Sequence, residues 1–259
     1  MIKLAANLTM LFTELPFMER FQAAAQAGFK GVEFLFPYAY DANEIAEQLR
    51  IHHLTLVLHN LPPGNWEAGE RGIACHPDRI AEFEAGVATA IDYAKILGTP
   101  QLNCLAGIVP DGVSAELAGQ TLVRNLGYAA SVLKQQQIRL LIEPINTFDM
   151  PGFFLSHTGQ ALDLIRQTGS DNLFVQYDIY HMQRMEGELI NTLRANLGMI
   201  KHLQLADTPG RFEPGTGEIN YRNLFAALDA MGYDGWTGCE YKPRNGTLAG
   251  LAWRAAHGV

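Results

Sequence analysis

The stretch Ile138-Arg-Leu-Leu-Ile-Glu143 is apolar along most of its length and ends in a carboxylate. A short run rich in Leu and Ile is typical of a strand that is buried on both faces. A charged acid is almost never fully buried alone, so one at the end of such a strand requires a metal, a cation or a shared proton. Asp178, Gln204 and Glu240 stand in similar runs: Leu173-Phe-Val-Gln-Tyr-Asp178, Ile200-Lys-His-Leu-Gln-Leu-Ala206 and Trp236-Thr-Gly-Cys-Glu240. Polar side chains at successive strand ends indicate one site.

Short apolar runs and amphipathic segments alternate along the whole chain. We expect strands over residues 4–8, 31–36, 54–58, 102–105, 138–143, 173–178, 200–206 and 236–240. Helices are expected between them, near 17–28, from 41, over 80–97, from 114, and near 159–167, 187–197, 221–231 and 248–256. Asp41 and Ser114 have the residue types that begin helices as N-caps.

Eight strand-plus-helix units predict a single closed parallel (β/α)8 barrel, a TIM barrel, over residues 1–259. Such a barrel is one domain of about 250 residues, and no Pro-, Gly- or Ser-rich linker divides this chain. An open doubly wound sheet is the main alternative, and it is disfavoured because no glycine-rich phosphate turn follows the first strand. In either fold the site lies at the carboxyl ends of the strands, where the polar residues occur.

Composition and charge argue against several partners and locations. The formal net charge is −8, whereas a nucleic-acid interface requires a basic patch. The N-terminus Met1-Ile-Lys-Leu-Ala-Ala has no charged region followed by a long apolar stretch, so we expect no signal peptide. No run of about 18 apolar residues occurs, so we expect no membrane span. The three cysteines stand at no metal-ligand spacing and suit a reducing cytosol, which predicts a cytoplasmic protein.

The donor types at the strand ends indicate a hard divalent cation. Glu143, Asp178 and Glu240 supply carboxylates and Gln204 a neutral carbonyl oxygen, which are ligands that Mg²⁺ and Mn²⁺ favour. Zn²⁺ would prefer a clustered set of His and Cys residues. A carboxylate beside such a metal can move a proton on a carbon next to a carbonyl group. The alternative is that each acid pairs with a Lys or Arg across the barrel.

Several other residues are candidates for contact with a substrate. His181 follows Asp178 by three positions, so on a rim loop it can reach a substrate oxygen, unless it bonds a backbone carbonyl. His59 follows the third strand and can donate to a substrate carboxylate or carbonyl, with an ordinary structural histidine as the alternative. Asp149, on the loop after Glu143, can pair with His181 or cover the metal.

Two loops carry further candidates. The segment from Leu61 to about Arg79 is longer than most loops, and its tryptophan favours a lid. It contains Glu70, a candidate for substrate contact, and Arg71, with solvated loop charge as the alternative for both. Arg211 lies in a loop rich in Pro and Gly, where a guanidinium can clamp a carboxylate.

Several segments together resemble a known family. They are Ala6–Phe12, Val32–Tyr38, Gly69–Cys75, Glu143-Pro-Ile-Asn-Thr-Phe-Asp149, Gln176–Gly187, His202-Leu-Gln-Leu-Ala-Asp207, Glu213–Tyr221 and Gly238-Cys-Glu-Tyr-Lys-Pro243. With these segments the chain resembles the xylose isomerase-like barrels and, among them, the hydroxypyruvate isomerase family. The resemblance extends over essentially the whole chain.

The resemblance implies an isomerisation of hydroxypyruvate to tartronate semialdehyde. Glu143 and Glu240 match the family's pair of acid/base glutamates. In related ketose epimerases these two also bind the metal, together with the equivalent of Asp178 and a histidine, and here Gln204 stands at the histidine position. An amide is a poorer transition-metal ligand than imidazole, which shifts the preference toward Mg²⁺. Arg211 lies one residue further along than the epimerase arginine.

The reaction that this resemblance implies requires a small hydroxy-oxo acid and neither a nicotinamide nor a flavin. The alternatives are a 2-oxo-tetronate isomerase on the same site, a cyclitol dehydratase-type lyase, and a noncatalytic binding barrel. A nuclease of the endonuclease IV type is disfavoured, since its zinc cluster requires many grouped histidines and a basic DNA-binding face. Trp66 and Phe153, on long loops, are candidates for contact with a second subunit in a homo-oligomer.

Overall fold

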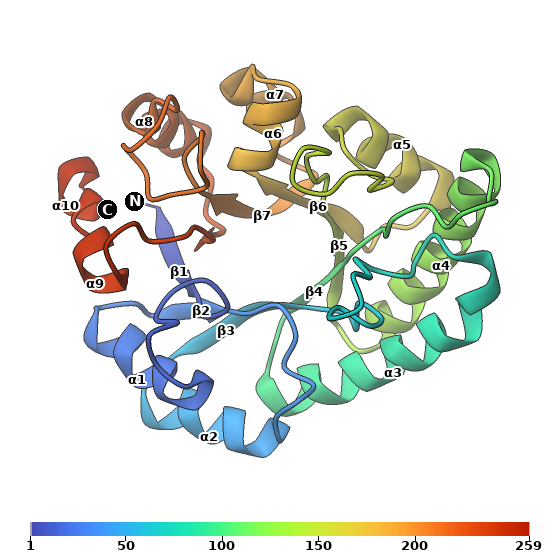
Figure 1. The fold of residues 1–259 in the computed structure, drawn as a ribbon, viewed down its shortest axis with the longest axis horizontal. Coiled ribbons are helices and arrows are strands. Elements are labelled where there is room, and N and C mark those ends of the chain that lie inside the picture. The colour runs from blue at the N-terminus through green and yellow to red at the C-terminus, as the bar shows by residue number, and fades with distance from the viewer. Residues whose placement is uncertain (1, 259) are drawn as a thin grey trace.

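A closed ring of eight parallel strands forms the centre of the molecule (Figure 1). In this computed structural model, which describes residues 2–258, the strands are paired in chain order, and β1 also pairs with β8, with Lys3 opposite Trp236. The strands are β1 (Lys3–Asn7), β2 (Gly31–Glu33), β3 (Thr55–Asn60), β4 (Gln101–Cys104), β5 (Arg139–Ile142), β6 (Leu173–Asp178), β7 (Ile200–Leu205) and β8 (Trp236–Cys239). This closure confirms the predicted barrel over an open sheet.

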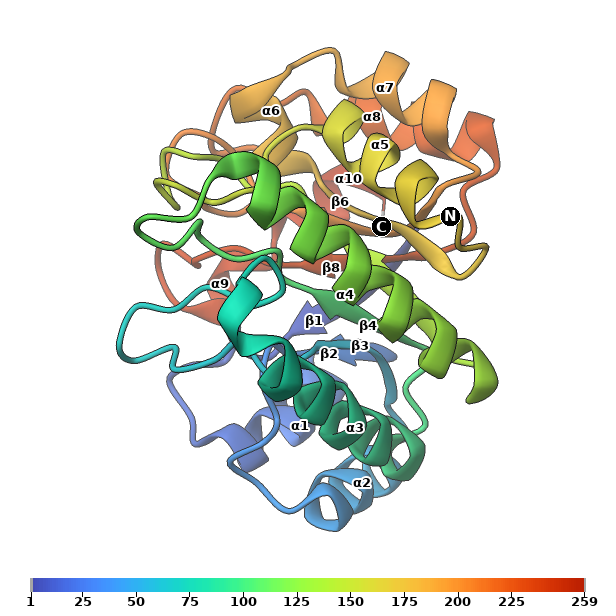
Figure 2. The same ribbon diagram turned by 90° about the vertical axis from the view of Figure 1, so that its right-hand side faces the viewer.

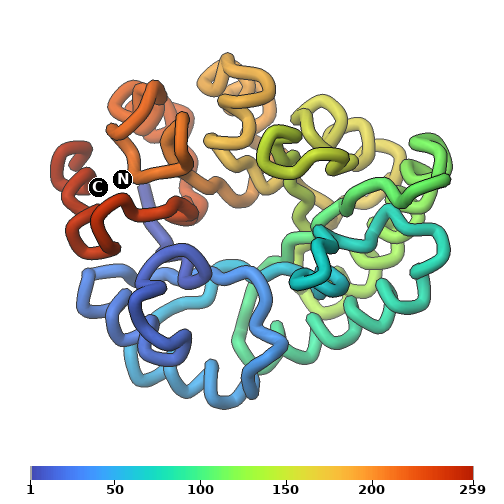
Figure 3. The backbone as a smooth tube through the Cα atoms, viewed as in Figure 1, coloured from blue at the N-terminus to red at the C-terminus, as the bar shows by residue number. Residues whose placement is uncertain are grey.

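Helices surround the barrel, and the chain passes once around it from α1 to α10 (Figures 1 and 3). The helices are α1 (Phe17–Gln26), α2 (Ala42–Ile51), the 3-10 helix η1 (Pro77–Arg79), α3 (Ile80–Leu97), α4 (Ala115–Gln135), α5 (Thr158–Thr168), α6 (Ile179–Met185), α7 (Leu189–Asn196), α8 (Tyr221–Met231), α9 (Thr247–Gly250) and α10 (Trp253–His257). Figure 2 shows the long helices α3 and α4 packed side by side on the outside.

Local signals in the sequence set several helix ends. Asp41 accepts a hydrogen bond from the amide of Asn43 at the start of α2, and Ser114 accepts one from the amide of Leu117 at the start of α4. These bonds satisfy amide groups that the first helical turn leaves free. Both predicted N-caps are therefore confirmed.

Two apolar clusters hold the barrel together. The larger one lies between the strands and the surrounding helices. The smaller one consists of Ala5, Val57, Leu58 and Leu141, with Phe174 and Trp236 packed against it. Its members come from three strands around the ring, β1, β3 and β5, so this cluster lies toward the inside of the barrel. A side chain at Gly31 would lie 2.6 Å from the ring of Trp236, so the packing of Trp236 against this smaller cluster requires glycine at position 31.

The structure corrects three local predictions. His181 was expected on a rim loop, but Asp178 caps a helix directly after β6, and His181 lies within that helix, α6. The expected closing helix over 248–256 is two short helices, α9 and α10, separated after Gly250. Phe153 is only 4% exposed, so it is core and not a free aromatic for a second subunit.

Within residues 2–258, no helix combines the length and the apolar character that crossing a membrane requires.

Candidate active site

The polar residues that follow or end β5 to β8 gather in one buried site. Asp178 of β6 is in register with Gln204 of β7, and Gln204 is in register with Gly238 of β8. Glu143 follows β5 directly and Glu240 follows β8. Asp178 and Gln204 are 0% exposed, Glu143 is 5% exposed and Glu240 is 6% exposed. Because the carboxyl ends of parallel strands meet at one end of a barrel, the fold concentrates the acids there.

Arg211 joins two of these acids. Its Nη2 atom lies 3.1 Å from Oε1 of Glu240 and 3.4 Å from Oδ2 of Asp178, and its guanidinium group lies over the ring of Tyr180. Burial raises the pKa of Glu240 to about 8, although the positive charge of Arg211 opposes this rise. The pKa of Asp178 is also raised by burial against the same opposing charge. Pairing with an arginine, the alternative to metal binding, is therefore observed for these two acids.

Glu143 forms no ion pair with an arginine or lysine of residues 2–258, although the charge of Arg211 acts on it from a distance and favours its charged form. Nδ2 of Asn103, at the end of β4, donates a 3.0 Å hydrogen bond to its Oε2 atom. Burial raises the pKa of Glu143 well above its usual value, and the negative charges of Glu240 and Asp178 raise it further. Glu143 therefore holds its proton to a higher pH than an exposed glutamate does, which is the tendency that a general acid requires.

His181 faces the same acids from α6. Its Nε2 atom lies 3.5 Å from Oδ2 of Asp178 and 4.0 Å from Oε1 of Glu143. Its Nδ1 atom lies 2.6 Å from Nδ2 of Asn146. Burial and the charge of Arg211 hold the pKa of His181 well below its usual value, so the ring is neutral. With the Asn146 amide donating to Nδ1, the neutral ring carries its proton on Nε2 and is a donor toward the site.

The predicted pairing of Asp149 with His181 is wrong. Asp149 accepts hydrogen bonds from Nδ2 of Asn146 and from the hydroxyl of Tyr180, and it forms an ion pair with Arg184. These bonds lower the pKa of Asp149 although burial raises it. The acid therefore reaches His181 only through Asn146, which it helps to hold in place.

The donor set fits a hard divalent cation. Glu143, Asp178 and His181 each offer a ligand atom, and these atoms all lie within 4.8 Å of one another. Two of the three donors are carboxylates, which Mg²⁺ and Mn²⁺ favour. The sequence assigned His181 to the substrate. With Nδ1 bonded to Asn146 and the proton on Nε2, this ring has no lone pair to offer a metal, so the two carboxylates are the candidate metal donors of this group.

Gln204 belongs to a chain of buried hydrogen bonds. Its Nε2 atom donates to Oε1 of Glu33 at 2.8 Å, and its Oε1 atom accepts from Nε2 of Gln176 at 2.7 Å. Glu33 also accepts from Asn7 at 3.0 Å and lies 2.6 Å from Nε2 of His202. A carbonyl oxygen has two lone pairs, so Oε1 of Gln204 keeps one free for a cation.

Sequence reasoning missed three of these buried residues. Glu33 closes the apolar run that forms β2, so it has the same signal as Glu143 and was overlooked only because that strand was expected to be longer. Asn103 and Asn146 are neutral amides on or after strands, a pattern too common to single them out.

His59 lies at the end of β3 and is fully buried. Its Nδ1 atom lies 3.3 Å from the carbonyl oxygen of Asn60 and 3.4 Å from the hydroxyl of Tyr38. Burial lowers the pKa of His59 to about 4, so the ring is neutral. Its Nε2 atom has no hydrogen-bond partner among the described residues, which leaves the predicted contact with a substrate open.

A cavity of about 450 Å³ leads toward the acids, with Arg211 among its lining residues. The others are Met10, Trp66, Arg71, Asp149, Met150, Tyr180, Arg184, Thr208, Pro209, Gly210 and Lys242. We call this cavity the mouth. Its cations outnumber its single acid, Asp149. Glu70 does not line it: the Glu70 carboxylate pairs with Arg79 and accepts from the amide of Asn65, and so holds its own loop.

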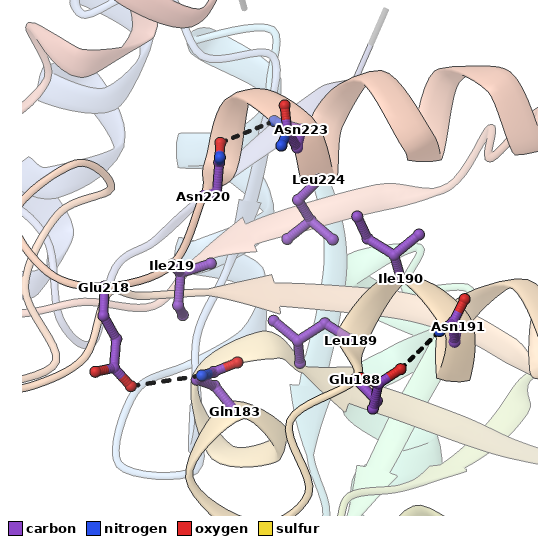
Figure 4. A pocket seen from close by; sticks show the side chains of 10 residues that line it. All are labelled: Gln183, Glu188, Leu189, Ile190, Asn191, Glu218, Ile219, Asn220, Asn223 and Leu224. Atoms are coloured by element: carbon purple, nitrogen blue, oxygen red, sulfur yellow. Dashed lines mark hydrogen bonds between the residues drawn. The ribbon is translucent and has the colours of Figure 1, made fainter.

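A smaller hollow of about 290 Å³ lies between α7 and α8 (Figure 4). Its two carboxylates are bonded to neighbouring amides, Glu188 to Asn191 and Glu218 to Gln183. None of the buried acids lines it. Arg211, which contacts Asp178 and Glu240, lines the mouth and not this hollow, so the mouth is the cavity next to the acids.

Comparison with known proteins agrees with this geometry. The family model of the xylose isomerase-like TIM barrel matches residues 21–257. The hydroxypyruvate isomerase of Escherichia coli is 57% identical over 98% of both chains. The 2-oxo-tetronate isomerase of Cupriavidus necator is 44% identical over 98% of this chain and 97% of the relative. A Brucella melitensis structure described as an AP endonuclease of family 2 superposes with a TM-score of 0.96, at 46% identity over 99% of both chains. The chain therefore belongs to the xylose isomerase-like TIM barrel family and, within it, to the hydroxypyruvate isomerase family.

Proposed function

We propose that this protein is an isomerase that interconverts hydroxypyruvate and tartronate semialdehyde (2-hydroxy-3-oxopropanoate) through an enediolate. The observation that carries the proposal is the buried pair of Glu143 and Glu240: burial raises the pKa of both, that of Glu240 to about 8. Carboxyl groups that exchange protons near neutral pH are suited to general acid/base catalysis. The 57% identity to a hydroxypyruvate isomerase, against 44% to a 2-oxo-tetronate isomerase, supports the three-carbon substrate.

The two glutamates divide the proton transfers. One carboxylate removes a proton from the hydroxymethyl carbon, and the electrons form an enediolate with negative charge on the former carbonyl oxygen. The proton of the hydroxymethyl oxygen then passes to that former carbonyl oxygen, which becomes the new hydroxyl group. The other carboxyl group delivers a proton to the former carbonyl carbon, which leaves an aldehyde and a 2-hydroxy acid. His181, with its proton on Nε2, donates a hydrogen bond to a substrate oxygen, and Arg211 holds the Glu240 carboxylate in place at 3.1 Å.

Glu143, Asp178, Gln204 and Glu240 are the proposed ligands of a divalent cation, Mg²⁺ or Mn²⁺. When bound, such an ion stabilises negative charge on a substrate oxygen, typically by several kcal/mol. The free lone pair of the Gln204 oxygen and the carboxylate oxygens of the three acids are the donors that this assignment uses.

The test is proton NMR of the metal-supplied enzyme with hydroxypyruvate in D₂O. We expect the aldehyde hydrate of tartronate semialdehyde to appear with solvent deuterium on its 2-carbon. If the enzyme converts a 2-oxo-tetronate but not hydroxypyruvate, the enediolate mechanism stands and the substrate is the four-carbon acid instead. No turnover of either acid would overturn the proposed isomerisation.

A further inference from the structure

The four cations of the mouth differ in how their charge is balanced. Arg184 pairs with Asp149, and Arg211 pairs with Asp178 and Glu240. Among the residues that the structure describes, Arg71 and Lys242 form no ion pair. The mouth therefore holds two positive charges that no acid of the described chain neutralises, beside an arginine already committed to the catalytic acids.

Arg71 is held in one orientation without an acid. Its Nη1 atom donates to the carbonyl oxygens of Trp66 at 3.0 Å and Glu70 at 2.8 Å. Its guanidinium group lies 4.1 Å from the centre of the Trp66 ring, and that ring packs against Phe36. The Nε and Nη2 edge of Arg71 has no hydrogen bond within residues 2–258. A guanidinium edge of this kind matches a carboxylate with two parallel hydrogen bonds.

The loop that carries Arg71 is braced on both sides. Glu70 accepts from the amide of Asn65 and pairs with Arg79. The amide of Gly72 donates to the carbonyl oxygen of Pro63 at 2.9 Å. A side chain at Gly72 would lie 2.5 Å from the carbonyl oxygen of Leu105, so the loop packs directly on the segment after β4. The segment Gly69-Glu-Arg-Gly72 takes no part in the proposed proton transfer. The contacts just described give it a different role, which is to hold Arg71 in place.

We propose that Arg71 binds the carboxylate of the substrate with two parallel hydrogen bonds, and that Lys242, on the loop after β8, supplies a second positive charge. This inference rests on the proposed function and names the group that selects a small 2-oxo acid over a neutral ketose. Arg211, which the sequence assigned to this anion, already contacts Asp178 and Glu240. Arg71 lines the same cavity as Arg211, which contacts Glu240, so a substrate held by Arg71 lies in the cavity next to the catalytic acids.

The test compares wild type with Arg71→Gln, Arg71→Lys and Lys242→Gln. Substrate KM is measured with hydroxypyruvate, and binding of tartronate, a stable dicarboxylate of similar size, is measured by titration calorimetry. In Arg71→Gln we expect KM and the tartronate Kd to rise about 10- to 100-fold, since a hydrogen-bonded charge pair is lost, while kcat changes much less. Arg71→Lys keeps the positive charge but cannot form two parallel hydrogen bonds. Its KM and tartronate Kd are therefore expected to lie between those of wild type and those of Arg71→Gln. Lys242→Gln is expected to raise both constants about threefold, the effect of a single exposed charge.

The matched control is Arg50→Gln, an exposed arginine of α2 paired with Glu47, which should leave both constants unchanged. Circular dichroism and thermal unfolding check that each variant folds, and Arg71→Lys provides the test if Arg71→Gln does not. A tartronate Kd within twofold of wild type in the folded Arg71 variants overturns the inference. Tartronate binding separates this failure from failure of the proposed function, because it is measured whether or not wild type converts hydroxypyruvate.

Discussion

At the scale of single residues, the two glutamates differ in what surrounds them. Glu143 receives one hydrogen bond, from Asn103, and Glu240 contacts the guanidinium group of Arg211. Both are buried, so each retains a proton at a higher pH than an exposed glutamate does. Proton transfer therefore depends on carboxyl groups that no amide can replace.

Glu143→Gln and Glu240→Gln should each lower kcat by about 10²- to 10⁴-fold while the fold is retained, because glutamine keeps the shape but cannot exchange a proton. The measurement is turnover followed by NMR, with circular dichroism as the folding check. Glu47→Gln, on the exposed face of α2, is the control. Retention of more than a few per cent of activity in both variants would remove the two glutamates as the acid/base pair.

The raised pKa of Glu240 also predicts how stability depends on pH. The folded protein holds this proton up to a pH of about 8, whereas the unfolded chain releases it near the ordinary value of 4.5. Between these values the folded state binds more protons, so the free energy of unfolding falls as pH rises. For metal-free protein, the melting temperature of Glu240→Gln relative to wild type should therefore increase from pH 5 to pH 8.5. A difference that stays constant over this range would show that Glu240 does not titrate in this window.

At the scale of elements, Asp178 has two structural roles at the junction of β6 and α6. Its Oδ1 atom accepts from the amide of Tyr180 and caps α6, while its Oδ2 atom faces Arg211 and His181. Asparagine caps a helix about as well as aspartate, but it carries no charge. The substitution Asp178→Asn therefore separates the cap from the charge.

Asp178→Asn should keep the melting temperature of metal-free protein near that of wild type and weaken binding of Mn²⁺, measured by titration calorimetry with the metal alone. Activity should return in part at high Mg²⁺ or Mn²⁺. Asp178→Ala, which loses the cap as well, should also lower the free energy of unfolding by about 1 kcal/mol. An unchanged Mn²⁺ affinity in Asp178→Asn would exclude this residue as a ligand.

The position of the buried Glu33 carboxylate of β2 depends on a glycine of β8. A side chain at Gly238 would lie 2.2 Å from Oε1 of Glu33, which holds His202 and Gln204. Gly238→Ala should thus displace the carboxylate and lower the free energy of unfolding by about 1–3 kcal/mol in a denaturant titration.

The control for that substitution is Gly127→Ala in α4, where an added side chain meets no atom within 4 Å. Alanine in the middle of a helix should raise stability there by up to about 1 kcal/mol. Equal effects of the two substitutions would mean that Glu33 is not confined as described.

At the scale of the whole molecule, the barrel concentrates Glu143, Asp178 and Glu240 at one end, where Arg211 is the only arginine or lysine of residues 2–258 that pairs with any of them. Saturation with Mg²⁺ or Mn²⁺ should therefore stabilise the folded protein, by about 2.7 kcal/mol at a hundredfold excess over Kd. For a chain of this size that corresponds to about 5–10 °C in melting temperature. Differential scanning fluorimetry with and without chelator measures it, with Glu143→Gln as the comparison. No shift in wild type at millimolar metal would contradict a divalent cation at these acids.

The sequence by itself determined the barrel and the strand ends that carry the acids. Its alternation of apolar runs and amphipathic segments has one closed arrangement, and that arrangement puts Glu143, Asp178 and Glu240 at the same end. The sequence was sufficient for these two conclusions, because hydrophobic periodicity and the order of the strands can both be read along the chain.

Only the tertiary structure decided which groups face one another. The contact of Arg211 with Asp178 and Glu240, the tautomer that Asn146 gives His181, and the unneutralised Arg71 at the mouth all join residues from different strands and loops. Hydrogen bonds and charges act over a few ångströms in space, and no spacing along the chain encodes such distances between separate loops.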